Sequence, residues 1–366
     1  MKKLIRYRDL TYNKKNIRKF EKIFSNFLLS GQYLPGQKTL EFEKKISSYC
    51  GRKFCIGVSS GSNALYLALK GLNIGKGDEI ICPAISWVAT ANAISMTGAR
   101  PVFVDVNLDQ NISPKDILQA INKNTKAIMM VHFKGIIADY YNIKKIANTN
   151  SLLLIEDAAQ AFGASISGTY AGNLGDISSF SFNPMKVLQG FGESGAVLTN
   201  SIKINLKIKK MRHLGVDVKN REISNYIELN SKIDEIQASL ILENLKSLKK
   251  EIKIRKKIIQ NYVNELKNFT IDCSYDLNNS SGYDYQILVK KRYRLKNYLN
   301  NKKIETKVKH PILMADQSTF KKNKKFNLKN ARWISKHSLS LPLHRNLSQK
   351  DQNYIIDSIK YFYKNN

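Results

Sequence analysis

Cysteine and long apolar runs are both scarce in this sequence. Its 366 residues contain four cysteines, Cys50, Cys55, Cys82 and Cys273, too few for a disulfide framework and without the second pair or histidines of a zinc site. No apolar run approaches the length that crosses a bilayer, and no apolar stretch follows the basic start as it would in a signal peptide. We therefore expect reduced thiols, no metal, no membrane partner and a cytoplasmic location.

Acidic residues are few as well. Lysine and arginine number 60 against 29 acids, which gives a net charge of +31. A charge of this size is typical of nucleic-acid or anionic-membrane binding, but here it is spread along the chain and is mostly lysine, accompanied by asparagine and isoleucine. These residues have AT-rich codons, and the lysines of 246–257 alternate with apolar residues at helical spacing, which places them on a solvated face. We expect no nucleic-acid function.

Strand-like and helix-like segments alternate through the first two thirds of the chain. Near-continuous apolar runs separated by helical patterns indicate a mostly parallel sheet with helices on both faces. The expected strands are 54–58, 79–82, 101–105, 127–132, 152–156, 177–182 and 196–199, and the expected helices include 40–49, 64–71, 87–96 and 113–121. After residue 230 the pattern changes to long charged helices, a strand at 283–290 and a helix from 348. We predict an α/β fold with a large domain at 1–242 and a smaller C-terminal α+β domain at 243–366.

The residues that best indicate a reaction type lie at the ends of two predicted strands. Asp157 and Gln160 follow an apolar strand, and Lys186 lies in a proline-broken loop after the next one. Open α/β sheets place their chemistry at the carboxyl ends of strands. An acid and a lysine there suit pyridoxal phosphate, with the lysine as Schiff base and the acid on the pyridinium nitrogen.

Two further features agree with this cofactor, although each has a structural alternative. The run SSGSN at 59–63 follows a strand and opens a helix, so its amides and the helix dipole favour phosphate, yet short Gly/Ser turns open many helices. Trp87, past another strand end, is placed to stack on a ring or to serve as a core aromatic. Asp157 is equally a helix cap or half of a buried salt bridge. The order of acid, lysine and phosphate loop favours the cofactor.

The chain resembles the DegT/StrS family of pyridoxal-phosphate-dependent nucleotide-sugar aminotransferases, which have fold type I of the aspartate aminotransferase superfamily. The resemblance runs from 34 to 342, and it is carried by SSGSNAL at 59–65, PVFVDV at 101–106, IEDAAQ at 155–160, FSFNPMK at 180–186, GESGAV at 192–197 and NSKIDEIQ at 230–237. It implies Lys186 and Asp157 as catalytic residues. It also implies cofactor contacts from Gly61, Ser62, Asn63, Trp87, Gln160 and Ser181, with Asn230 supplied by the partner subunit of a homodimer.

The resemblance further implies amino transfer from L-glutamate or L-glutamine to a keto group of a nucleotide-linked keto-deoxy sugar, for amino-sugar and surface-polysaccharide biosynthesis. The segment 230–237 slightly favours amination at C3 over C4. Departures fall on the sugar side. The family often has a His-Tyr-Pro run near the C-terminal substrate wall, where this chain reads VKHPIL at 308–313, and Lys134 stands where an aromatic is common. We expect Lys309, His310 and Glu193 to contact substrate. The alternatives are a sugar dehydratase, against which Lys186 argues, and a non-catalytic regulatory paralogue.

Overall fold

The computed structural model describes residues 3–220, 222–272, 274–323 and 325–365. Within them, seven strands form one sheet in the order β1-β9-β8-β5-β4-β2-β3, in which β9 runs antiparallel to both neighbours and the remaining pairs are parallel. The strands are β1 (Phe54–Val58), β2 (Glu79–Pro83), β3 (Arg100–Val104), β4 (Thr125–Val131), β5 (Leu153–Asp157), β8 (Ile177–Ser181) and β9 (Gly195–Thr199). The predicted strand series is confirmed to within two residues at each end.

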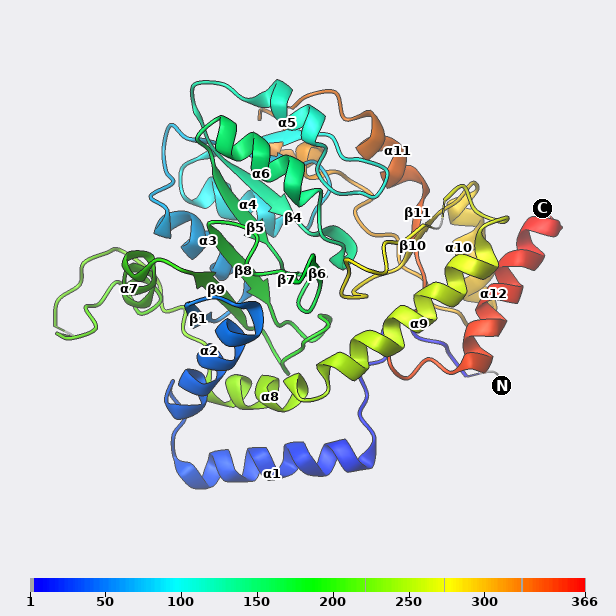
Figure 1. Ribbon diagram of the computed structural model, residues 1–366. Helices are drawn as coiled ribbons and strands as arrows, with labels where there is room; N and C mark the ends of the chain where they lie inside the picture. The colour runs from blue at the N-terminus through cyan, green and yellow to red at the C-terminus, as the bar shows by residue number, and fades with distance from the viewer. Residues whose placement is uncertain (1–2, 221, 273, 324, 366) are drawn as a thin grey trace.

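Alternate residues of each strand enter two different cores, as the pleat requires. Ile128 of β4 packs with α2 (Gln37–Cys50), α5 (Pro114–Ala120), α6 (Tyr140–Thr149) and α8 (Glu235–Leu245). Its neighbour Met129 packs on the opposite face with α3 (Gly61–Gly71), α4 (Ala89–Met96), α7 (Ile202–Met211) and α11 (Lys329–His337). The central sheet is thus sandwiched by helices, as predicted (Figure 1).

A third core lies in the C-terminal part of the chain. It gathers apolar side chains of α9 (Leu248–Leu266), α10 (Arg292–Asn301) and α12 (Gln349–Lys364) around the short antiparallel pair β10 (Gln286–Leu288) and β11 (Ser338–Ser340). The predicted boundary at residues 242 and 243 falls inside α8, and the division into two domains stays a prediction. The remaining small sheet pairs β6 (Ser165–Ile166) with β7 (Thr169–Tyr170).

The strand predicted at 283–290 is too long. The ladder covers only Gln286–Leu288, because the main chain on its N-terminal side is bonded elsewhere. The carbonyl of Tyr283 accepts from the guanidinium of Arg8, and the amide of Asp284 donates to the carbonyl of Lys134 over 3.3 Å. Contacts with two remote segments therefore replace strand pairing.

The helix α1 (Lys14–Ser30) was not among the predicted helices. It lies apart from the sheet, alongside α8 (Figure 1). Asn13 caps it through a 2.9 Å bond from the amide of Asn16, and Gly31 ends it in the left-handed conformation. None of its residues is buried in this chain. Both termini lie near α12, where residue Ile5 pairs with the segment at Ile304.

Cys50, Cys55 and Cys82 are buried free thiols; Cys273 lies outside the described residues. In the part of the chain that the structure describes, no helix combines the length and the apolar character needed to cross a membrane.

Candidate active site

The site forms where β5 and β8 end side by side. Asp157 is the last residue of β5, and its side chain is almost fully buried, with 4% of its surface exposed. Its two oxygens accept from the hydroxyl of Thr90 over 2.9 Å and from the amide of Ala159 over 3.2 Å. Burial raises the pKa of Asp157, while those two bonds and the nearby charge of Lys186 oppose the rise. The structure therefore brings the predicted acid and lysine into one electrostatic environment.

The predicted phosphate loop meets the end of β8. Ser60 caps α3 by accepting the amide of Asn63 over 3.1 Å, and the amide group of the Asn63 side chain donates to the hydroxyl of Ser59 over 2.7 Å. The first-turn amides at Gly61 and Ser62 have no intrahelical acceptor, so they are available to an anion.

The approach of that loop to β8 depends on a glycine. A Cβ added to Gly61 would lie 2.6 Å from the Cβ of Ser181, closer than real Cβ atoms come. A residue without a side chain therefore lets the first turn of α3 reach the serine. The four predicted phosphate contacts, Gly61, Ser62, Asn63 and Ser181, gather at one place.

Lys186 lies in the loop after β8, half-buried rather than enclosed. Its amide donates to the carbonyl of Asn183 over 2.9 Å, and its ammonium nitrogen lies 5.1 Å from the ring centroid of Tyr283. Glu193, predicted to contact substrate, is exposed and accepts from the side-chain amide of Asn183 over 2.5 Å. In this structure Glu193 supports the loop that carries Lys186.

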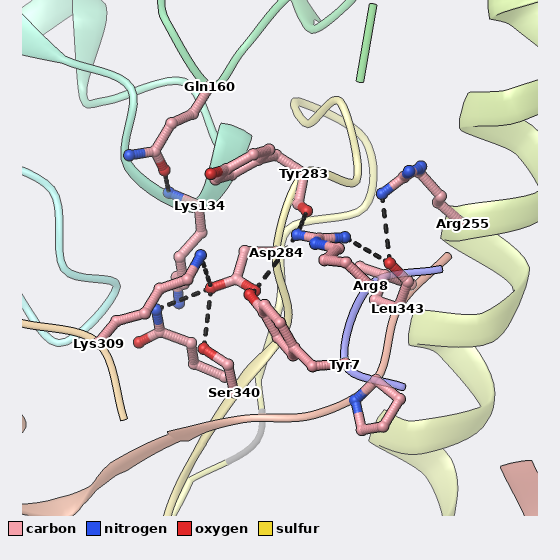
Figure 2. Close-up of polar contacts among 12 residues, drawn as sticks. Tyr7, Arg8, Lys134, Gln160, Arg255, Tyr283, Asp284, Lys309, Ser340 and Leu343 are labelled. Atoms are coloured by element: carbon pink, nitrogen blue, oxygen red, sulfur yellow. Dashed lines mark hydrogen bonds and ion pairs between the residues drawn. The ribbon is translucent and has the colours of Figure 1, made fainter. Parts of the chain in front are cut away.

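Gln160 is held by the main chain of Lys134. Its side-chain oxygen accepts the Lys134 amide over 2.8 Å (Figure 2). The hydroxyl of Ser281 donates to the Gln160 carbonyl over 2.8 Å. Lys134 has a φ of 59°, which a non-glycine residue adopts only at a cost in backbone energy. Because the Lys134 amide occupies the side-chain oxygen of Gln160, the NH₂ group of Gln160 remains available to a ligand.

Trp87 is not a core aromatic: 67% of its surface is exposed, and it lies in the loop before α4 instead of in the predicted helix. It lines a cavity of about 250 Å³ together with His310, whose ring centroid lies 6.3 Å away. Burial, followed by the charge of Lys309, lowers the pKa of His310 to about 4, so this imidazole is neutral at pH 7. The cavity is walled by Ser86, Trp87, Val88, His310, Pro311, Ile312, Met314 and Gln317.

Lys309, the other predicted substrate residue, is held in an ion pair and is partly buried, with 18% of its side chain exposed. Its ammonium lies 3.1 Å from a carboxylate oxygen of Asp284, which Arg8 approaches from the other side (Figure 2). Burial alone would raise the pKa of Asp284, but Lys309 and Arg8 outweigh it and hold that pKa below its usual range. Asp284 also accepts from Tyr7 over 2.6 Å, Gln286 over 2.9 Å and Ser340 over 3.1 Å.

Asn230 lies at the base of a long loop between α7 and α8. Its side chain is exposed, and the main chain of this segment is anchored beside the phosphate loop, where the amide of Ser59 donates to the carbonyl of Ser231 over 2.8 Å. The oxygen of the exposed Asn230 side chain accepts a long bond of 3.5 Å from the amide of Lys232. The assignment of Asn230 to the partner's site stays a prediction.

Sequence reasoning missed Thr90, His132, Tyr283 and Asp284. The hydroxyl of Thr90 donates to the carboxylate of Asp157. The one feature of the sequence that could have pointed to Thr90 is its place three residues after Trp87. His132 ends the β4 segment beside Asp157; its Nδ1 accepts from the amide of Ala138 over 3.2 Å, so Nε2 carries the hydrogen toward Glu156, 3.0 Å away. A polar residue directly after an apolar strand was the available signal for it.

These residues fit pyridoxal phosphate. The buried carboxylate at the end of β5 suits the ring nitrogen, the amides of α3 with Ser181 suit the phosphate, and Lys186 supplies an amine whose charge acts on Asp157. The close contact at Gly61 supports this fit, because a residue without a side chain lets the first-turn amides of α3 lie directly beside Ser181, where together they would hold the phosphate.

Comparison with known proteins agrees with this geometry. The model of the DegT/DnrJ/EryC1/StrS aminotransferase family matches residues 14–360. A pleiotropic regulatory protein of Geobacillus stearothermophilus is 32% identical over 351 residues, covering 94% of each chain. The dTDP-3-amino-3,6-dideoxy-alpha-D-galactopyranose transaminase of Aneurinibacillus thermoaerophilus is 32% identical over 348 residues, covering 94% of this chain and 95% of the relative.

Among solved structures, NtdA of Bacillus subtilis with bound cofactor PMP superposes with a TM-score of 0.91 at 29% identity, covering 99% of this chain and 85% of that one. The match of the family model, the relatives over nearly the full length and the shared fold agree with one another. The chain belongs to the DegT/DnrJ/EryC1/StrS aminotransferase family and is a pyridoxal-phosphate-dependent aminotransferase of fold type I.

Proposed function

We propose that this aminotransferase moves an amino group from L-glutamate or L-glutamine to the keto group of a nucleotide-linked keto-deoxy sugar, in amino-sugar and surface-polysaccharide biosynthesis. The observation that carries the proposal is the convergence of Asp157, Lys186 and the first turn of α3 at adjacent strand ends. The dTDP-amino-sugar transaminase at 32% identity supports the class of acceptor. Its name, together with the segment 230–237, favours C3 as the carbon aminated.

The roles of the residues follow from their positions. Pyridoxal phosphate, when bound, supplies a conjugated ring that accepts electrons from the reacting carbon. The buried carboxylate of Asp157 would hold the proton of the ring nitrogen, since a charge-assisted hydrogen bond there favours the pyridinium form. Lys186 would bind the cofactor covalently and, when released, move a proton between the donor's α-carbon and the cofactor. The free NH₂ of Gln160 would donate to the ring oxygen.

The sugar would enter from the cavity beside Trp87. The indole is largely exposed there, and the neutral His310 offers a hydrogen-bonding ring without a charge. The excess of 60 basic over 29 acidic residues attracts the diphosphate of a sugar nucleotide and raises its encounter rate. The ammonium of Lys309 is already paired with Asp284, so Lys309 would shape the wall of this cavity and would not offer a free charge to the substrate.

We infer that the active form is a homodimer. The apolar side chains of α1 include Leu29 with 83% of its surface exposed, and no residue of this helix is buried. Ile227 and Leu229, next to Asn230, are 101% and 76% exposed. Apolar surface of this kind on a long loop and an unburied helix is typical of an interface. A second copy would cover it and receive Asn230 at its phosphate site.

The test is incubation of the purified protein with pyridoxal phosphate, glutamate or glutamine, and a panel of keto sugar nucleotides, with products identified by mass spectrometry. The wild-type protein should form an amino sugar, and borohydride should fix the cofactor to Lys186. Lys186→Ala should lose both properties, whereas Lys126→Ala, at an exposed lysine of β4, should keep them. A dehydrated sugar would instead indicate a dehydratase, and cofactor without any turnover would indicate a regulatory paralogue.

A further inference from the structure

Tyr283 is surrounded by cationic side chains from three separate segments of the chain. Its ring centroid lies 4.8 Å from the ammonium of Lys309, 5.1 Å from the ammonium of Lys186 and 5.2 Å from the guanidinium carbon of Arg8. Cations at this distance from an aromatic ring are attracted by its electron-rich face. One tyrosine therefore contacts both the amine proposed to react and two cations that play no part in the chemistry.

The ring is fixed in place. Tyr283 is 8% exposed, and its carbonyl accepts from the guanidinium of Arg8. On its other side the turn at Gly135, with φ of 81°, packs so closely that an added Cβ would lie 2.9 Å from the Cβ of Tyr283. These contacts hold the backbone and the Cβ of Tyr283 on both sides. The ring is consequently a fixed surface against which the mobile Lys186 rests.

Charge balance at the ring distinguishes Lys186 from its two companions. Lys309 and Arg8 both have Asp284 as a counter-ion, at 3.1 Å and 3.5 Å. No ion pair to Lys186 occurs among the described residues, although Asp157 is near enough for the two charges to interact. The aromatic face is thus the contact that receives the Lys186 ammonium, whereas Lys309 and Arg8 have the carboxylate of Asp284 in addition to the ring.

We propose that the ring face of Tyr283 holds the amine of Lys186 whenever that amine is not bonded to the cofactor, which makes Tyr283 a positioning residue for amino transfer. The inference rests on the role given to Lys186 under the proposed function. A released lysine has many rotamers, and a fixed resting place keeps its nitrogen within reach of the next proton transfer.

The ionisation of Tyr283 gives a test that needs neither cofactor nor activity. Burial would raise the pKa of Tyr283, but Lys186, then Lys309 and Arg8, lower it to about 8 against the influence of Asp284. Tyr7, which bonds to Asp284, is the other ionisable group in the cluster; burial and Asp284 raise its pKa to about 12, well clear of this range. Ultraviolet absorbance of tyrosinate in the cofactor-free protein should show a step near pH 8 that Tyr283→Phe removes.

The decisive variant in this titration is Lys186→Met. Removing a charge next to the ring should move the Tyr283 step to higher pH by about 1 pH unit. The matched control is Lys207→Met, which removes a lysine 6.0 Å from the ring of Tyr226, away from the site, and should leave the step in place. A step that does not respond to Lys186→Met would overturn the proposal, even if the enzyme aminates sugars as proposed.

Kinetics of the holoenzyme distinguish the contribution of the Tyr283 ring from that of its hydroxyl group. Tyr283→Phe keeps the aromatic face and should retain kcat within about threefold, whereas Tyr283→Leu should lower kcat about tenfold with little change in KM for the sugar. Equal kcat values in the two variants would refute the role of the ring face. Should Tyr283→Leu fail to fold, the titration of Lys186→Met decides alone.

Discussion

Replacing Asp284 by Asn should destabilise the protein far more than its small change in shape suggests. The carboxylate has 1% of its surface exposed and faces two cations, Lys309 at 3.1 Å and Arg8 at 3.5 Å. The substitution keeps the volume but leaves both cations buried without a counter-ion. Loss of one partner from a buried ion pair typically costs about 3–5 kcal/mol, and we expect a loss of unfolding free energy in that range.

Urea unfolding at pH 7 measures this loss. Asp276→Asn is the matched control, because Asp276 is exposed and accepts a local bond from the amide of Asn278 over 2.9 Å; it should change the unfolding free energy by less than about 1 kcal/mol. Adding Lys309→Met to Asp284→Asn should recover part of the loss, since one of the two stranded cations is removed. A loss below about 1 kcal/mol for Asp284→Asn would show that the cluster is solvated or rearranges, and the reasoning would fail.

The contribution of Asp284 to the unfolding free energy should also depend on pH. Its folded pKa is lowered by Lys309 and Arg8, so its contribution to stability is complete above the pKa of an unfolded aspartate, about 3.9, and declines as the pH falls below that value. The difference in unfolding free energy between the wild type and Asp284→Asn should therefore shrink as the solution is acidified. A difference that stays constant down to pH of about 2 would contradict the ion-pair account.

Two predictions concern the shared site. Asp157→Asn should lower turnover far more than cofactor affinity, because an amide cannot keep the ring nitrogen cationic; near-normal turnover in steady-state assays would make Asp157 purely structural. Lys186→Ala and Asn230→Asp should each be inactive alone, yet subunit exchange between them should restore up to about a quarter of wild-type activity, since each mixed dimer has one intact site. Confirmed exchange without recovered activity would place Asn230 in its own chain's site.

Local patterns were sufficient for the strands and for the cofactor side of the site. The strands that carry Asp157 and Ser181 are short and buried, and their positions in the chain followed from the sequence. The order of the strands in the sheet and the antiparallel direction of β9 did not. Resemblance to the family supplied the cofactor contacts, and the structure gathers Gly61, Ser62, Asn63 and Ser181 at one point. Each of these segments is local in the chain, but the phosphate site joins two that are distant in sequence, 61–63 and the end of β8.

The opposite wall of the site depends on residues far apart, and here prediction from the sequence was poor. Tyr7 and Asp284 bond to each other across 277 positions, and Arg8 reaches Tyr283 across 275. Nothing in either segment alone indicates this contact, and the strand predicted at 283–290 was wrong for the same reason. The helix α1 was not predicted, although Ile17, Phe24 and Leu28 recur at helical spacing on one face. None of its residues is buried within one chain, so its apolar face does not belong to any of the three cores.

The departures from the family pattern are physically coupled rather than independent. A lysine at position 309 introduces a buried charge into the wall of the site, which requires a carboxylate nearby. Asp284 supplies that carboxylate, and the ion pair then fixes the neighbouring Tyr283 next to Lys186. Lys309, on the sugar side, and Lys186, the reacting lysine, therefore contact the same aromatic ring, that of Tyr283. Replacing Lys309 by an uncharged residue would leave Arg8, at 3.5 Å, as the remaining counter-ion of Asp284, so the carboxylate would lose one of its two cations and keep the other.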